Sequence, residues 1–220
     1  MRVGVVVFPG SNCDRDVHHV LMDTGHEPAY VWHEHAIPDN IEALILPGGF
    51  SYGDRLRAGA IASHSPIMRH VRYMAREGMP ILGICNGFQI LAEGGLLPGV
   101  LLHNDTARFT CRWTRIRYGG AKTPFTIPLR NGDAIPIPVA NGEGRYHADP
   151  DTIRHMEENS QVVFRYTENI NGSAGDIAGV CNIDGNVLGL MPHPERAAEY
   201  DTNPYDHRPA RSIFKSLGDM

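Results

Sequence analysis

The segment 80–93 constrains the fold more than any other part of the chain. An apolar run of strand length enters a Gly-x-Cys-x-Gly turn and continues with the pattern of a helix. Gly83 and Gly87 flank the cysteine, and their lack of side chains lets the strand and the helix approach closely. The pattern therefore predicts a sharp strand-to-helix corner, with Cys85 lifted clear of a buried sheet.

Such a corner suits a nucleophile. The first N–H groups of a helix have no partner within the helix and carry the positive end of its dipole, which favours a thiolate at Cys85. The N–H of Asn86 can also donate to an oxyanion formed when a thiolate attacks a carbonyl carbon. The alternative is a buried structural cysteine with incidental glycines, and this segment alone does not decide between the two.

Length and composition restrict the class of protein. With 220 residues, of which 42% are hydrophobic, we expect a single domain over residues 1–220. A net charge of −5 and the lack of a basic run predict no binding to nucleic acid. No stretch has transmembrane or signal-peptide character, so we expect no membrane association. Four scattered cysteines without a C-x-x-C pair favour reduced thiols and a cytoplasmic location.

The first half of the chain reads as alternating strands and helices. β-branched runs predict strands at 3–8, 29–33 and 43–46, and capped amphipathic patterns predict helices from about 12 to 24 and from 66 to 78. This order is typical of a doubly wound, mostly parallel central sheet flanked by helices.

The sequence pattern changes after residue 95, where glycines and prolines interrupt short segments with strand character. We expect antiparallel strands at 109–118 and 123–129, and further strands at 161–166, 177–183 and 187–190. Prolines exclude 135–139 from the centre of a sheet. The expected fold class is therefore α/β, with an added antiparallel strand region and a last helix at about 209–217.

A His-Pro-Glu segment follows the predicted strand at 187–190. Pro192 and Pro194 hold it out of a helix, and positions two apart in an extended chain face the same way. His193 and Glu195 are therefore expected to project together from a strand end. An imidazole can take the thiol proton of Cys85, and a carboxylate can orient that imidazole. By itself, such a segment is more often a solvated loop.

A glycine-rich turn at 47–50 ends the predicted strand at 43–46. Ligands bind beyond the carboxyl ends of parallel strands, so the N–H of Gly49 or Phe50 could complete an oxyanion hole with Asn86. The alternative is a tight strand exit without a function.

The remaining cysteines and the histidine clusters suggest no second site. Cys13 also precedes a predicted helix, but no histidine-carboxylate pair is near it in the sequence. Cys111 and Cys181 fall in strand-like runs and are expected in the core. We predict no metal site, because the histidine clusters lack a third ligand at a suitable spacing.

Together, these motifs resemble a known family. The segment 83–89 and the His-x-Glu at 193–195 are similar to the nucleophile turn and the His-x-Glu of class I (triad-type) glutamine amidotransferases. Five further segments, 8–14, 47–54, 56–62, 111–112 and 140–145, resemble one branch of that family, the glutaminase subunits of phosphoribosylformylglycinamidine synthases of purine biosynthesis.

The resemblance implies hydrolysis of glutamine to glutamate and ammonia through a thioester on Cys85, with His193 and Glu195 completing the triad. Gln89 would contact bound glutamine, and the turn formed by Asn141, Gly142 and Glu143 would lie near its α-amino and carboxylate groups. Arg55 stands where the family usually has an aromatic or apolar residue.

The resemblance also implies partners. A large synthetase subunit would use ATP and Mg²⁺ to make formylglycinamidine ribonucleotide with the ammonia, and a small subunit would bridge the two, while this chain itself would need no cofactor. Two alternatives stay open, the same glutaminase serving another acceptor enzyme and a non-catalytic regulatory subunit.

Overall fold

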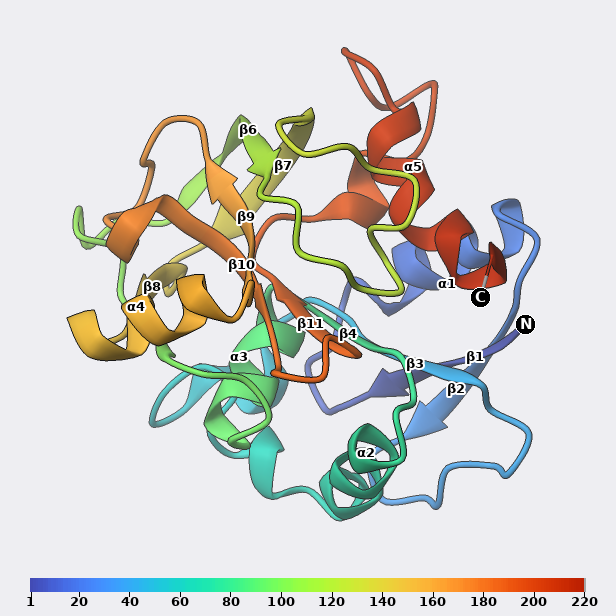
Figure 1. The fold of residues 1–220 in the computed structure, drawn as a ribbon. Helices are drawn as coiled ribbons and strands as arrows, with labels where there is room; N and C mark the ends of the chain where they lie inside the picture. Colours follow the sequence, from blue (N-terminus) through green and yellow to red (C-terminus); the bar gives the residue numbers. More distant parts are fainter. Residues whose placement is uncertain (220) are drawn as a thin grey trace.

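The computed structural model of the chain describes residues 1–219. Over these residues, a nine-stranded sheet runs through the molecule in the spatial order β2-β1-β3-β4-β11-β10-β9-β6-β7, and β5 and β8 form a small second sheet (Figure 1). The strands of the main sheet are β1 (Arg2–Val7), β2 (Glu27–Trp32), β3 (Ala43–Leu46), β4 (Ile81–Ile84), β6 (Thr110–Tyr118), β7 (Ala134–Asn141), β9 (Val162–Tyr166), β10 (Ile177–Cys181) and β11 (Val187–Leu190). The small sheet pairs β5 (Val100–Leu102) with β8 (Arg145–His147).

The parallel part of the sheet comprises β2, β1, β3, β4 and β11. Every residue of β3, β4 and β11 is buried, as expected for continuous apolar runs covered on both faces. Helices α1 (Asp14–Asp23) and α5 (Arg208–Lys215) cover one face, and α2 (Ile67–Arg76) and α3 (Asn86–Glu93) cover the other (Figure 1). The doubly wound, mostly parallel sheet predicted from the sequence is confirmed.

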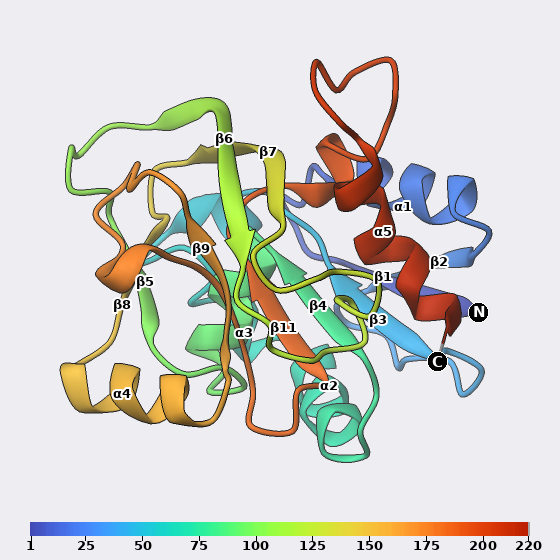
Figure 2. The ribbon, with the colours of Figure 1, turned by 45° about the horizontal axis from the view of Figure 1, so that its top comes forward.

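The antiparallel part continues the same sheet through β10, β9, β6 and β7. It lies at the opposite end of the molecule from β2 (Figure 2). The prolines of β7 occupy an edge strand, since β7 pairs only with β6 within the described residues, and this agrees with their predicted exclusion from the sheet centre. Strands β10 and β11, which follow one another in the chain, pair antiparallel as a hairpin.

The strand expected at 123–129 is wrong, because this segment forms consecutive turns. Pro124 and Pro128 cannot donate to a sheet ladder. The side chains of Thr123 and Thr126 instead bond to nearby backbone groups, such as the Thr126 hydroxyl to the carbonyl of Ala121 at 3.1 Å. Local side-chain bonds thus replace strand pairing here.

Helix α4 (Pro150–Glu158) was not among the predicted elements. Its sequence carries a start signal, because Asp149 accepts hydrogen bonds from the N–H groups of Asp151 and Thr152, and Pro150 occupies the first helical position. Of the helices in residues 1–219, none combines the length and the apolarity that a membrane span requires.

Candidate active site

Cys85 lies at the corner between β4 and α3. Its backbone has φ 50° and ψ −104°, a conformation that is rare for a residue with a side chain. The close approach of the two elements maintains it, because a Cβ added at Gly87 would lie 1.9 Å from the carbonyl oxygen of Leu46. A Cβ at Gly83 would meet the backbone of Gly87 at 2.7 Å. Both glycines of the motif are therefore required by packing.

His193 and Glu195 follow directly after β11. The Nδ1 atom of His193 lies 2.7 Å from Oε1 of Glu195, and each residue is only 2% exposed. The N–H of His193 donates to the carbonyl of Pro138 in β7 at 2.9 Å, which anchors this segment to the antiparallel part of the sheet. With Nδ1 bonded to the carboxylate, Nε2 is left available for a reacting group.

The electrostatics favour the protonated form of His193. Burial lowers the pKa of the ring, but attraction to Glu195 and to Cys85 outweighs it and holds the pKa well above its usual value. A buried carboxylate that stabilises an imidazolium next to a thiol is the arrangement needed for proton exchange between sulfur and imidazole.

Two adjoining cavities meet at Cys85. The first, of about 150 Å³, is lined by Cys85 and by the predicted residues Gly49, Phe50, Gln89, Asn141, Gly142 and Glu143. The second is lined by Cys85, His193, Gly49 and Phe50, among others. The structure thus brings together four predicted parts of the site. These are the nucleophile Cys85, the base His193, the glycine-rich turn at 47–50 and the turn at 141–143, which is called the substrate turn below.

The backbone N–H groups predicted to bind an oxyanion are not all free to donate a hydrogen bond. The N–H of Phe50 already donates to the carbonyl of Gly10 at 3.0 Å. Within residues 1–219, no acceptor is recorded for the N–H groups of Gly49 and Asn86. These two N–H groups are therefore the pair that can donate hydrogen bonds to a developing negative charge.

A chain of hydrogen bonds joins three segments around the cavity, which are the glycine-rich turn, helix α3 and the substrate turn. The N–H of Ser51 donates to Oδ1 of Asn86 at 3.1 Å, and Nδ2 of Asn86 donates to Oε1 of Gln89 at 2.9 Å. Gln89 then donates from Nε2 to the backbone carbonyl of Glu143 at 2.7 Å. Since the side chains of Ser51, Asn86 and Gln89 are buried, this chain holds the glycine turn, the helix and the substrate turn in register.

Asn104 supports the substrate turn from behind. Its Nδ2 donates to the carbonyl of Asn141 at 2.9 Å, and its Oδ1 accepts from the N–H of Gly144 at 3.0 Å. Asn141 itself has a side-chain amide that is buried and lacks a partner in the described residues, beside the cavity it lines. A buried amide without partners is available to a ligand.

Asp54 is a site residue that the sequence analysis did not identify. It lines the cavity with Glu143, and its Oδ1 is buried without a partner among residues 1–219. Burial and the charge of Glu143 raise its pKa to about 6. Its position beside the glycine-rich turn is a signal in the sequence, but its approach to Glu143 depends on the fold.

The expectation that Cys13 lacks a histidine-carboxylate pair is wrong. Cys13 precedes α1 and lies beside His193 and Glu195, with ligand atoms of all three within 4.8 Å of one another. The expectation of a buried Cys111 is also wrong, since this residue is exposed on β6, whereas Cys181 is buried as predicted. Only Ile116 and Tyr118, near the end of β6, are buried, so the part of the strand that holds Cys111 lies outside the core.

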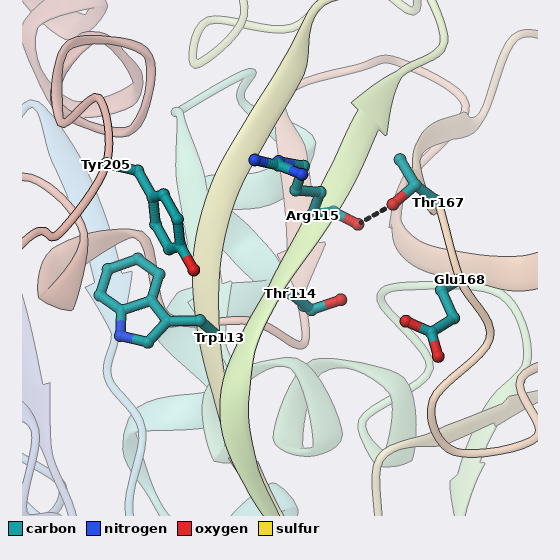
Figure 3. Close-up of a pocket in the computed structure, with 6 residues that line it drawn as sticks. All are labelled: Trp113, Thr114, Arg115, Thr167, Glu168 and Tyr205. Atoms are coloured by element: carbon teal, nitrogen blue, oxygen red, sulfur yellow. Dashed lines mark hydrogen bonds between the residues drawn. The ribbon is translucent and has the colours of Figure 1, made fainter.

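A further cavity lies over β6, away from Cys85. Figure 3 shows Tyr205 against Trp113, with ring centroids 5.5 Å apart, and Thr167 bonded to the backbone of Arg115. The guanidinium of Arg115 lies 5.6 Å from the centre of the Tyr205 ring. These contacts hold the loop before α5 on the sheet and contain no nucleophile with a base.

Comparison with known proteins agrees with this geometry. The family of CobB/CobQ-like glutamine amidotransferase domains matches residues 1–217. The phosphoribosylformylglycinamidine synthase subunit PurQ of Rubrobacter xylanophilus is 56% identical over 199 residues, which is 90% of this chain and 90% of that protein. A chain of the PurLQS structure from Thermotoga maritima superposes with a TM-score of 0.90 at 46% identity, covering 99% of this chain and 97% of that one.

A more distant structure shares the fold. A glutamine amidotransferase from Thermotoga maritima has a TM-score of 0.66 at 14% identity and covers 100% of this chain and 96% of its own. At this identity, the likeness concerns the sheet and its helices only.

Proposed function

Since this chain belongs to the family of CobB/CobQ-like glutamine amidotransferase domains, we propose that it is the glutaminase subunit of a phosphoribosylformylglycinamidine synthase. The observation that carries this function is the convergence of Cys85 and His193 at one cavity, with Glu195 bonded to His193, in a chain 56% identical to a subunit of that name. We take residues 1–220 as one such domain.

The chemistry is acyl transfer from a primary amide. The thiolate of Cys85 attacks the side-chain carbonyl carbon of glutamine while the imidazolium of His193 holds the thiol proton. The N–H groups of Asn86 and Gly49 bind the oxyanion, and His193 then gives its proton to the departing nitrogen, which leaves as ammonia. Water, deprotonated by His193, hydrolyses the γ-glutamyl thioester, and Glu195 keeps the ring oriented throughout.

The cavity residues supply the contacts for glutamine. The buried side-chain amide of Asn141 has free donors and an acceptor for the α-carboxylate and α-amino groups. Asp54 and Glu143 place two carboxylates in the same cavity, which suits the α-ammonium. Gln89 and Gly142 shape the wall, and Gln89 is held in place by Asn86 and by the backbone of Glu143.

Ammonia made here serves an ATP-dependent synthetase subunit. In support, one chain of the PurLQS structure is 46% identical to this one. We further propose a small bridging subunit, use of ATP and Mg²⁺ by the synthetase alone, and a cytoplasmic location, which the four free cysteines suit. We also expect an oxyanion site that is completed only in the complex, because an unregulated glutaminase would waste glutamine, so the isolated chain should release ammonia more slowly than the assembled enzyme.

Assay of the assembled complex with two nitrogen sources tests this function. With glutamine, the Cys85→Ala complex should form no formylglycinamidine ribonucleotide, whereas with added ammonium chloride it should form the product at the wild-type rate. Wild-type glutamine-dependent activity of Cys85→Ala would refute the role of the cysteine. Complexes with other acceptor enzymes, recovered together with the endogenous chain, would instead identify a different synthase.

A pH series tests the proposed binding of the α-ammonium group of glutamine by Asp54. Because the pKa of Asp54 is about 6, the carboxylate is protonated at lower pH and its attraction for the α-ammonium is lost. KM for glutamine should therefore rise as the pH falls below 6 in the wild type, and Asp54→Asn should show a raised KM that does not change across this range. A pH-dependent KM in Asp54→Asn equal to that of the wild type would exclude Asp54 from substrate binding.

A further inference from the structure

Cys13, His193 and Glu195 form a compact cluster, hereafter the Cys13 cluster. One ligand atom from each, a thiol sulfur, a ring nitrogen and a carboxylate oxygen, lies within 4.8 Å of the other two. Each residue is 2% exposed. Nothing in the proposed glutaminase chemistry uses Cys13, so the presence of a second sulfur beside the catalytic imidazole needs its own explanation.

Two buried atoms of the cluster lack partners. Nε2 of His193 and Oε2 of Glu195 are inaccessible to solvent and make no hydrogen bond within the part of the chain that the structure describes. Buried polar atoms are rarely left unpaired, because the hydration they lose is not replaced. Glutamine chemistry accounts for Nε2 but not for the outer carboxylate oxygen. The free atoms therefore point to a ligand that accepts electron pairs.

The donor set selects the class of that ligand. Thiolate, imidazole and carboxylate are the ligands of Zn²⁺, whereas Mg²⁺ and Ca²⁺ prefer oxygen alone. A thiolate and a carboxylate together carry two negative charges, which balance a divalent cation beside a neutral imidazole. Both charge and softness therefore favour a thiophilic divalent cation.

The backbone keeps the cluster together. The N–H of Cys13 donates to the carbonyl of Gly48 at 3.2 Å, which ties the start of α1 to the turn after β3. A Cβ added at Gly48 would lie 2.9 Å from Cε1 of His193 and 3.0 Å from Sγ of Cys13. The glycine thus leaves the sulfur and the ring side by side, and the cavity shared with Cys85 provides a path of entry.

Besides His193, Arg196 is a second cationic group beside the sulfur of Cys13. Its Nη2 lies 3.3 Å from Sγ of Cys13, and its Nε donates to Oδ2 of Asp16 at 3.1 Å. Because the Arg196 side chain is 41% exposed and has Asp16 as a second partner, it can withdraw toward solvent when a cation arrives. Its charge weakens the binding, which makes the site suited to reversible occupation.

We propose that the Cys13 cluster binds Zn²⁺ or a similar thiophilic divalent cation, with Cys13, His193 and Glu195 as ligands. On binding, the thiol proton of Cys13 and one ring proton of the His193 imidazolium pass to solvent, and the sulfur–metal and nitrogen–metal bonds form. Coordination takes both His193 and Glu195 away from Cys85, so the cation inhibits ammonia release. The binding stands by itself, and only this inhibition rests on the proposed glutaminase function.

Cobalt spectroscopy on the full chain tests the binding without reference to activity. In Cys85→Ala, where the catalytic thiol is absent, Co²⁺ should give a sulfur-to-cobalt charge-transfer band that added Zn²⁺ abolishes. The double variant Cys85→Ala, Cys13→Ser should lose the band, and the matched variant Cys85→Ala, Cys111→Ser should keep it. Thermal unfolding of each variant establishes that it is folded.

Inhibition supplies the second readout. Zn²⁺ should inhibit the wild-type complex, a chelator should restore activity, and Cys13→Ser should raise the inhibitory concentration by more than the roughly 10–100-fold that loss of an outer-shell contact costs. Absence of the band in folded Cys85→Ala would overturn the metal site. A Cys13-dependent band in the Cys85→Ala chain, together with a wild-type complex that releases no ammonia from glutamine, would retain the site while refuting the glutaminase.

Discussion

Two cysteines stand at similar corners of this molecule. Cys13 follows the turn after β1 and precedes α1, and Cys85 follows β4 and precedes α3. Both lie beside His193, but their backbones differ. Cys13 has an ordinary conformation, with φ −98°, whereas Cys85 has φ 50° and ψ −104°. In the proposed mechanism only Cys85 is the nucleophile, and we infer that the strained turn, rather than a position at a helix start, distinguishes it from Cys13.

The flanking residues explain the difference. At the Cys85 corner, glycines on both sides let α3 pack against the end of β3, and the sulfur is presented into the substrate cavity. At the Cys13 corner, burial raises the pKa of the thiol, while its contacts with His193 and Arg196 only partly oppose this. Cys13 thus remains a protonated thiol near neutral pH and leaves the imidazole to Cys85.

Serine substitutions at the two cysteines should give the largest difference between the two corners. Cys85→Ser should lower glutaminase turnover by about 10⁴-fold or more, as for loss of other triad nucleophiles, because the hydroxyl is a much weaker nucleophile. Cys13→Ser should keep most of the activity in metal-free buffer. Ammonia release by the assembled complex measures both, and equal losses would show that the two corners share one catalytic role.

Glu195→Gln removes the carboxylate that serves the imidazole beside both cysteines. Turnover should fall by about 10²- to 10⁴-fold, since the ring loses its orientation and its stabilised charge. The rates at saturating glutamine measure this effect, and a KM change alone would contradict it.

The same variant has a predicted pH signature. A folded-state pKa of His193 above its unfolded value of about 6.5 stabilises the fold below pH 6.5, and this contribution is lost as the pH rises through the folded pKa. The stability gap between the wild type and Glu195→Gln should therefore be largest near pH 6 and shrink in alkaline buffer. Urea unfolding at several pH values tests the sign.

Gly87→Ala should break the Cys85 corner itself. The added Cβ would lie 1.9 Å from the Leu46 carbonyl, so β3 and α3 must move apart, at a cost of about 3 kcal/mol or more in the free energy of unfolding. Gly142→Ala is the matched control for stability, because its nearest neighbour would be the Phe109 ring at 3.7 Å. Similar denaturation midpoints for both variants would mean that the packing is looser than described.

Arg196→Gln should have the smallest effect and should act on the Cys13 corner alone. The charge of Arg196 lowers the pKa of Cys13, so its removal should slow alkylation of Cys13 by neutral iodoacetamide several-fold at pH 8. The measurement uses the Cys85→Ala chain and mass spectrometry of the labelled peptide, with exposed Cys111 as the internal standard. A faster reaction at Cys13 would contradict the proposed role of this charge.

Much of the fold was readable from the sequence because its signals are local. Apolar runs, caps and glycines lie within a few residues of the elements they define, as in β3, α2 and the corner at Cys85. The exceptions have local causes too. Residues 123–129 contain β-forming side chains, but threonine-to-backbone bonds and prolines override them, and α4 buries a single residue, Met156, so its apolar signal is weak.

The sequence predicted those parts of the candidate site in which the interacting residues are close together in the chain. The prediction that His193 and Glu195 project together agrees with their 2.7 Å contact. The extended backbone expected for this segment is wrong, because Pro194–Arg196 forms a turn of 3-10 helix in which proline is tolerated at the first position. The hydrogen bond between Gln89 and the Glu143 backbone, by contrast, joins residues 54 apart. The sequence contains no local signal for such a bond.

The sequence by itself determined the strand-to-helix corner at Cys85, the His-x-Glu segment and the family to which they belong, because each depends on neighbouring residues and on backbone sterics. Only the tertiary structure decided that Asp54 faces Glu143 and that Cys13 lies against His193 and Arg196, a contact that spans 183 positions. Strand order in the sheet brings these loops to one edge, and strand order is set by packing of the whole core.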